Sequence, residues 1–262
     1  MEQTNPPVFF DAHCHLQDER LLPDITDVLA RAKAAGVAAM SCCGSSESDW
    51  QDVKLLAAAR EEIFPSFGLH PWYVAQRTKT WDTALASSLE ELPSAGVGEI
   101  GLDHALDKST FEDQEKVFTR QLALAAEYGR PVTIHCRRAI GRLTELLKQC
   151  GGVPGGGIVH SYSGPVELVK TLEDFGLCIS FSGSVTFPNS KRARAALAAV
   201  SSDRLCIETD CPDIAPLGWG ASVNEPATIG AVAKVAAELR GVSVGEIAKL
   251  TYANASKVFV KR

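Results

Sequence analysis

Residues 8–15 read VFFDAHCH, an apolar, strand-like run that ends in two histidines. The same arrangement, a short apolar or β-branched run closed by polar residues, recurs along the chain. Longer segments of helical periodicity separate the runs, and this alternation is typical of repeated strand–helix units around a parallel sheet. Eight strands are expected, at residues 8–15, 37–43, 63–70, 97–103, 132–136, 157–162, 177–182 and 205–210.

Helices are expected between the strands, for example at residues 21–35, 48–62, 111–128, 141–150, 166–175 and 190–200. Two further helical stretches, 226–239 and 244–260, follow the last strand. No linker-like, repeated or low-complexity segment divides the chain. We therefore predict an α/β fold, a (β/α)8 TIM barrel of the usual length of about 250 residues, as a single domain over residues 1–262. A doubly wound open sheet is the alternative.

Polar side chains at the ends of the predicted strands favour the closed barrel. Nearly every run ends in a polar residue, which would be out of place inside a hydrophobic core. In a barrel, the carboxyl ends of the strands converge on one mouth. The sequence therefore predicts one polar pocket at that mouth, to which these residues would contribute: His13, His15, His70, Glu99, Asp103, His135, His160, Ser182 and Asp210.

The histidines in this set indicate a metal site. His13 and His15 form an H-x-H pair, and alternate side chains of a strand point the same way, so both imidazoles can reach one ion. Five of the six histidines lie at strand ends, with carboxylates at two others. Imidazoles and carboxylates are the ligands that divalent transition metals take, and carboxylates can bridge two ions about 3.5 to 4 Å apart. His104 lacks such a pattern and is expected either to be structural or to support a ligand from behind.

The composition is that of an ordinary globular protein, with 45% hydrophobic and 22% charged residues among 262. A net charge of −6 argues against a basic surface over the whole protein for nucleic acid or an anionic membrane. The apolar runs are far shorter than the roughly 20 residues that span a bilayer, and residues 1–10 lack the features of a secretory signal. We therefore expect a cytoplasmic protein with reduced cysteines, no membrane association and no obligate protein partner.

The sequence lacks the motifs of several other classes of enzyme. The sequence contains no P-loop, no G-x-S-x-G elbow and no H-E-x-x-H helix. Residues 96–101 spell G-x-G-x-x-G, but they lie inside a predicted strand rather than opening a helix, so they are not interpreted as a dinucleotide site. Ser161 and Ser163 lack a convincing base and orienting acid, which disfavours a serine nucleophile.

Six ordered runs, taken together, form a specific pattern: FDAHCHL at 10–16, GLHP at 68–71, GEIGLD at 98–103, TIHCR at 133–137, HSYSG at 160–164 and ETDCP at 208–212. This pattern resembles the TatD family of metal-dependent hydrolases over almost the whole chain. The resemblance implies an amidohydrolase-like TIM barrel. Members of that family include deoxyribonucleases and phosphoesterases that depend on magnesium or other divalent metals.

The resemblance also implies two divalent metal ions per chain. The histidine-rich ligand set suits Zn²⁺, Mn²⁺ or Fe²⁺, and the resemblance admits Mg²⁺ as well. One ion would be held by His13, His15, Glu99 and Asp210. The second would be held by His135 and His160, with Glu99 bridging the two. Two ions in this arrangement would activate a water and stabilise the leaving oxygen during hydrolysis.

The catalytic and substrate-binding residues follow from the same pattern. Asp210 is expected to act as general base, and Glu99 to complete the catalytic pair as the bridging carboxylate. Arg137 is placed to clamp a phosphate oxygen, and His70 to contact substrate or orient a ligand. Trp72 and Tyr73 could stack on a base, although packing is the favoured interpretation for both.

Three functions are compatible with these residues. The first is a phosphodiesterase or deoxyribonuclease, exonuclease-like, that acts on DNA. The second keeps the site but hydrolyses an amide, an ester or a small phosphoester, because fold does not determine function. The third is a binding protein that retains a metal-stabilised barrel without catalysis, which the complete ligand set disfavours.

Overall fold

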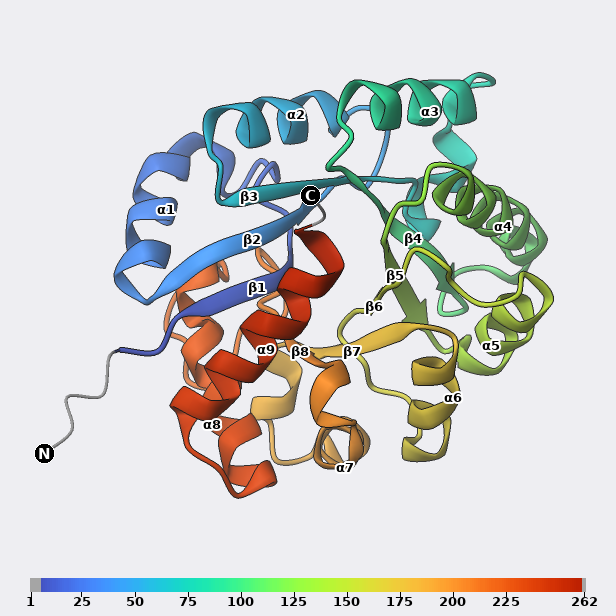
Figure 1. Cartoon of the computed structure of the whole chain (residues 1–262). Coiled ribbons are helices and arrows are strands. Elements are labelled where there is room, and N and C mark those ends of the chain that lie inside the picture. The colour runs from blue at the N-terminus through green and yellow to red at the C-terminus, as the bar shows by residue number, and fades with distance from the viewer. Residues whose placement is uncertain (1–5, 261–262) are drawn as a thin grey trace, which may run out of the picture.

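The computed structural model describes residues 6–260, and within them one sheet of eight parallel strands in the order β1 to β8 (Figure 1). The predicted α/β barrel is confirmed. The strands are β1 (Phe9–Cys14), β2 (Val37–Cys43), β3 (Ile63–Phe67), β4 (Gly96–Asp103), β5 (Val132–Arg137), β6 (Gly157–Val159), β7 (Leu177–Phe181) and β8 (Leu205–Ile207).

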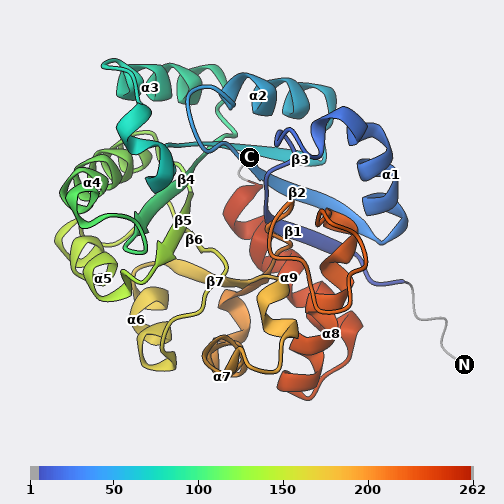
Figure 2. The same cartoon turned by 180° about the vertical axis from the view of Figure 1, so that it is seen from behind.

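Helices surround this sheet in both views of the molecule (Figures 1 and 2). They are α1 (Ile25–Ala34), α2 (Trp50–Ala59), α3 (Trp81–Glu91), α4 (Phe111–Glu127), α5 (Ile140–Gln149), α6 (Val169–Asp174), α7 (Lys191–Ala199), α8 (Ile229–Arg240) and α9 (Val244–Phe259). Helix α3 was not among those expected, although its buried Trp81, Leu85 and Leu89 recur every four residues, which is a helical spacing. No described helix is both long and apolar enough to cross a membrane.

Three strands end three residues earlier than the sequence predicted. β3, β6 and β8 end at Phe67, Val159 and Ile207, before the polar groups that were expected within them. His70, His160 and Asp210 therefore lie on the segments that follow these strands. Backbone hydrogen bonds still continue past the strand ends, because the N–H of His160 donates to Ile134 of β5 at 3.0 Å and that of His70 donates to Ser45 at 2.9 Å.

The barrel closes between β1 and the segment that follows β8. The backbone N–H of Asp210 donates to the carbonyl of His13 at 3.0 Å, and that of His15 donates to Cys211 at 2.8 Å. A side chain reinforces this seam, because the fully buried carboxylate of Asp11 accepts the backbone N–H of Thr209 at 2.9 Å and its hydroxyl at 2.5 Å. The seam positions His13, His15 and Asp210 against one another.

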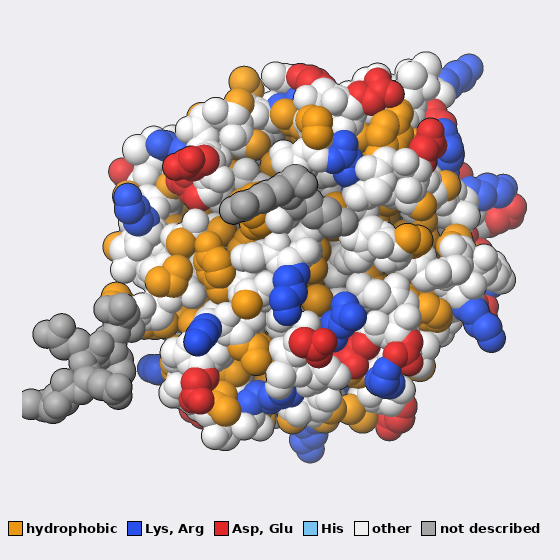
Figure 3. Space-filling view, viewed as in Figure 1, with side chains coloured by type: hydrophobic (Ala, Val, Ile, Leu, Met, Phe, Trp, Pro, Cys, Tyr) orange, Lys and Arg blue, Asp and Glu red, His pale blue; other side chains and the backbone are white. Residues whose placement is uncertain are grey.

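Helix α9 covers the end of the barrel at which the strands begin. Its Val258 and Phe259 pack against Phe10 from β1, with the rings of Phe10 and Phe259 5.8 Å apart. Figure 3 shows this face: acidic and basic side chains are interspersed, and no histidine is visible on it. In Figure 2, seen from the other side, α9 lies behind the strands. This packing leaves the opposite end of the barrel open for a site.

We predict that replacing Asp11 by Ala weakens the barrel seam. The change leaves the buried N–H and hydroxyl of Thr209 without their acceptor, so the free energy of unfolding should fall by about 1–3 kcal/mol. Urea denaturation followed by circular dichroism measures the loss. Asp203→Ala, an exposed carboxylate, is the control and should change stability by less than about 0.5 kcal/mol. Equal stability of the two variants would contradict a stabilising role for the seam.

Candidate metal centre

Five histidines and two carboxylates meet at the open end of the barrel, as the sequence predicted. A cavity of about 610 Å³ there is lined by His15, His70, Glu99, His135, His160 and Asp210. His13 lies just beneath it and is fully buried. A larger groove of about 890 Å³ beside α9, at the other end, has no histidine among its described lining residues. The side chains that could bind a metal ion therefore gather at one end of the barrel.

Irregular strand pairing affects the direction of two of these side chains, those of His13 and Glu99. On β1, three residue steps from Asp11 to Cys14 oppose two steps on β2. On β4, three steps from Val97 to Ile100 oppose two steps on β5. Such bulges re-aim side chains next to active sites. They include the positions of His13 and Glu99, so simple alternation along a strand does not predict the direction of either side chain.

Glu99 is the centre of the cluster. One oxygen, Oε2, lies 3.1 Å from His15 Nε2 and 3.4 Å from His13 Nε2. The other, Oε1, lies 2.8 Å from His160 Nε2, 3.0 Å from His135 Nδ1 and 3.3 Å from His70 Nε2. A single carboxylate that is 2% exposed thus separates two groups of imidazoles, one on each oxygen.

Asp210 connects the same two groups from the other side. Its Oδ1 lies 3.4 Å from His13 Nε2, and its Oδ2 lies 3.9 Å from His160 Nδ1. Its backbone adopts the left-handed conformation (φ 56°), which aspartate tolerates better than most residues and which is common at functional sites. Asp210 is therefore a second carboxylate placed between His13 and His160.

The hydrogen bonds behind the imidazoles determine which ring nitrogen is free. His15 Nδ1 lies 2.7 Å from the carbonyl of Cys43, and His160 Nδ1 lies 3.3 Å from Glu208 Oε1. With a proton on Nδ1 to bond to these acceptors, Nε2 of both rings is the nitrogen that faces the cluster and that can bind a cation. His135 is reversed: its Nε2 faces Asp103 Oδ2 at 3.5 Å, so Nδ1 faces Glu99.

The imidazole of His70 differs from those of His15 and His160, because its Nδ1 accepts a hydrogen bond instead of donating one. Burial lowers the pKa of its imidazole to about 4, so the ring is neutral near pH 7. Its Nδ1 accepts the backbone N–H of Trp72 at 3.1 Å, which places the ring proton on Nε2, facing Glu99. Although His70, Glu99 and His135 lie close enough to hold an ion, this tautomer makes His70 a hydrogen-bond donor to Glu99.

The donor set fits divalent cations. His13 Nε2 and His15 Nε2 are 3.0 Å apart, which matches two ligands about 2.1 Å from one ion at a right angle. Burial opposes ionisation of Glu99, yet His160, His70 and His13 hold its pKa well below its usual range. Burial likewise raises the pKa of Asp210, but contacts with His13 and His160 lower it overall. Two ionised carboxylates among imidazoles form a pocket suited to positive charge.

Arg137 lines the cavity, and Asp103 lies buried next to His135 and Arg137. Asp103 is fully buried, and its Oδ2 accepts the indole N–H of Trp72 at 2.7 Å. Burial raises the pKa of Asp103, but the bonds from His135 and Trp72 lower it overall. The guanidinium of Arg137 lies 3.9 Å from the same oxygen, and its side chain is 56% exposed. Arg137 lines the cavity, whereas Arg138 does not.

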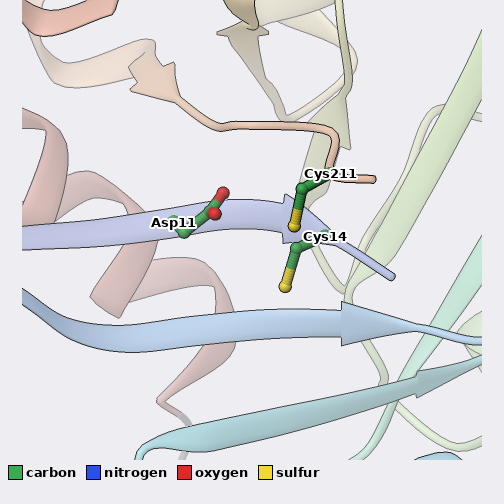
Figure 4. Close-up of side chains that lie close together, drawn as sticks. All are labelled: Asp11, Cys14 and Cys211. Atoms are coloured by element: carbon green, nitrogen blue, oxygen red, sulfur yellow. The ribbon is translucent and has the colours of Figure 1, made fainter. Parts of the chain in front are cut away.

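A second cluster lies at the barrel seam. Figure 4 shows Asp11 and Cys14 on β1 beside Cys211 on the segment after β8. Their potential ligand atoms are within 4.8 Å of one another. Both oxygens of Asp11 already accept hydrogen bonds from Thr209, and burial raises the pKa of the Cys14 thiol well above its usual value. We therefore interpret this cluster as part of the seam.

Sequence reasoning missed two residues that orient the imidazoles. Glu208 is fully buried, and its Oε1 accepts the backbone N–H of Ser161 at 2.7 Å as well as facing His160. Asp103 was expected at the pocket but was given no role. Both stand in runs that were singled out, 208–212 and 98–103, so their presence was visible. Their function depends on a ring nitrogen that the sequence does not place.

The fold and the site have the features of a metal-dependent hydrolase. A model of the TatD related DNase family matches residues 10–260. The chain is 33% identical over 255 residues to the uncharacterized metal-dependent hydrolase YabD of Bacillus subtilis (strain 168), an alignment that covers 96% of this chain and 99% of YabD. The chain belongs to the TatD family.

Two further relatives agree. The 3'-5' ssDNA/RNA exonuclease TatD of Pectobacterium parmentieri is 31% identical over 262 residues, covering 95% of this chain and 98% of that protein. The crystal structure of YjjV, a TatD homolog from Escherichia coli K12, superposes with a TM-score of 0.92 at 31% identity and covers 97% of this chain and 98% of that one. The family assignment made from the sequence motifs is confirmed.

We predict that Glu208→Gln weakens metal binding about 10–100-fold, because His160 loses the charged acceptor that orients it. Titration of the metal-free protein with Mn²⁺ in a calorimeter measures the affinity. The control is Glu173→Gln, which removes another buried carboxylate that accepts a backbone N–H, from Ser201, outside the site. If both variants bind Mn²⁺ like the unchanged protein, Glu208 does not orient a ligand.

Proposed function

We propose that this protein is a two-metal phosphodiesterase that degrades single-stranded nucleic acid from an end. The observation that carries the proposal is the position of Glu99, whose two oxygens face separate groups of imidazoles. His13, His15 and Asp210 with one oxygen would hold one ion, and His135 and His160 with the other oxygen would hold a second. A divided donor set around one carboxylate supports two ions.

Bound divalent cations would lower the pKa of a water, polarise the phosphoryl oxygen and stabilise the leaving oxygen. The side chains have distinct tasks around them. Asp210 is 7% exposed and lines the cavity, so it can accept the proton of the attacking water. His70 donates to Glu99 Oε1 and keeps that carboxylate oriented. Arg137 reaches the cavity with an exposed guanidinium that can bind a non-bridging phosphate oxygen.

The choice of nucleic acid has two supports. One is similarity to a relative named as a 3'-5' ssDNA/RNA exonuclease. The other is the presence of a cationic side chain, Arg137, beside the candidate metal centre.

A second candidate function, hydrolysis of a small phosphoester, an ester or an amide, is favoured by the charge of the rim. Asp18, Glu19, Asp49 and Asp213 line the cavity, and the cation nearest them, Arg20, is already paired with Asp18 and Asp213. Such a rim disfavours many phosphate contacts. Activity on nucleic acid that falls steeply with salt would indicate several phosphate contacts, whereas a small neutral substrate should show little salt dependence.

We predict that the metal-stripped protein regains cleavage of end-labelled single-stranded DNA when Mg²⁺, Mn²⁺ or Zn²⁺ is added back. Asp210→Asn should lower kcat by about 10²–10⁴-fold, because the general base is lost. Gel analysis of the labelled fragments measures both. If no ion restores cleavage of DNA or RNA although about two ions bind, the nuclease function is wrong and small phosphoesters, esters and amides become the substrates to test.

We predict that Arg137→Ala lowers kcat/KM on single-stranded DNA by about 10–150-fold, as expected for loss of a charge-assisted hydrogen bond of about 1.5–3 kcal/mol. Metal content should not change, since Arg137 contacts none of the proposed ligands except through Asp103. Arg138→Ala is the matched control, because its exposed side chain lies outside the cavity lining. Equal activity of the two variants would remove the phosphate role of Arg137.

A further inference from the structure

Trp72 is an exposed aromatic side chain at the rim of the cavity. It is 50% exposed, whereas Trp50 and Trp81 are 5% and 9% exposed. It lies in the short 3-10 helix η2 (Pro71–Gln76), which follows the segment carrying His70, and it lines the same cavity as the candidate metal ligands. The packing role favoured from the sequence accounts for only part of Trp72, because half of its surface is exposed.

The exposed indole is held in one orientation. Its ring N–H donates to Asp103 Oδ2 at 2.7 Å, and its backbone N–H donates to His70 Nδ1 at 3.1 Å. The His70 ring packs edge-on against it, with centroids 5.0 Å apart. Because Asp103 is fully buried and ionised, this hydrogen bond anchors one edge of the indole firmly. An aromatic group fixed in this way loses little conformational entropy when a ligand stacks on it.

The anchor places Trp72 next to the proposed reaction site. The oxygen that accepts the indole N–H, Asp103 Oδ2, also faces His135 Nε2 at 3.5 Å and Arg137 Nη1 at 3.9 Å. One carboxylate oxygen therefore links an exposed aromatic ring, a candidate metal ligand and the candidate phosphate clamp. A substrate with phosphate on Arg137 would bring its neighbouring group to the indole.

We propose that Trp72 is the stacking platform for the base of the terminal nucleotide, and that it makes the enzyme prefer nucleotides over sugar phosphates that lack a base. This inference rests on the proposed function and names its specificity residue. Stacking on an aromatic side chain is worth about 1–3 kcal/mol per base and depends little on base identity. A base in a duplex must first leave its own stack, so the same contact favours single strands.

Binding by the metal-loaded protein tests the proposal directly. The two probes are thymidine 5'-phosphate and 2-deoxyribose 5-phosphate, which share sugar and phosphate and differ in the base. We expect the unchanged protein to bind the nucleotide about 5–150-fold more tightly in a calorimeter, which corresponds to the stacking energy. Trp72→Leu should reduce this preference to less than about 3-fold and leave the affinity for the sugar phosphate unchanged.

Trp72→Phe keeps an aromatic ring but loses the bond to Asp103, so it should retain an intermediate preference. It also provides the test if the leucine variant does not fold. Trp219→Leu is the matched control, because Trp219 is a partly exposed tryptophan outside the cavity lining, and this variant should retain the full preference. A preference that persists in Trp72→Leu, or that the unchanged protein does not show, overturns the proposal.

Cleavage separates this inference from the proposed function. We expect the unchanged protein to cleave a single-stranded oligonucleotide with an abasic terminal residue more slowly than the normal oligonucleotide, and Trp72→Leu to cleave both at similar rates. If the protein cleaves neither but still binds the nucleotide through Trp72, the nuclease function fails and the stacking platform stands. If both are cleaved equally by the unchanged protein, the platform fails and the nuclease function stands.

Discussion

The structure depends on one buried carboxylate in contact with imidazoles from several strands. Glu99 is almost inaccessible to water, and an ionised carboxylate in that position is costly unless charges or hydrogen bonds compensate it. The compensating groups come from β1, from β5 and from the segments after β3 and β6. The closed barrel brings them together. The seam between β1 and the segment after β8 and the candidate metal centre are therefore two parts of one arrangement.

A further layer of acceptors gives the imidazoles their orientation. The carbonyl of Cys43 faces Nδ1 of His15, and the carboxylate of Glu208 faces Nδ1 of His160. The carboxylate of Asp103 faces Nε2 of His135. His70 reverses this logic, because it accepts a backbone N–H and turns a proton toward Glu99. Identical residue types thus acquire different roles from the hydrogen bonds behind them, which explains why proximity alone does not identify a ligand.

The sequence predicted the barrel well because each strand is apolar and each ends in a polar residue that has a place only at a barrel mouth. It also predicted which histidines and carboxylates would meet. It did not predict that β6 and β8 stop early, or that β1 and β4 carry register shifts beside His13 and Glu99. Those features arise from pairing with neighbouring strands, and the alternation of side chains along one strand carries no information about that pairing. The roles of Glu208 and Trp72 likewise depend on contacts across the cavity.

The charge distribution at the mouth limits what the substrate can be. Acidic side chains line one part of the rim, and Arg20 is committed to two of them, while Arg137 lies on the part nearest His135. A long polyanion lying across the whole mouth would be repelled by the acidic part. A chain end that places one phosphate beside Arg137 and one base against Trp72 avoids that repulsion. The same charges that argue against a basic nucleic-acid surface over the whole protein are therefore compatible with a site that engages only an end.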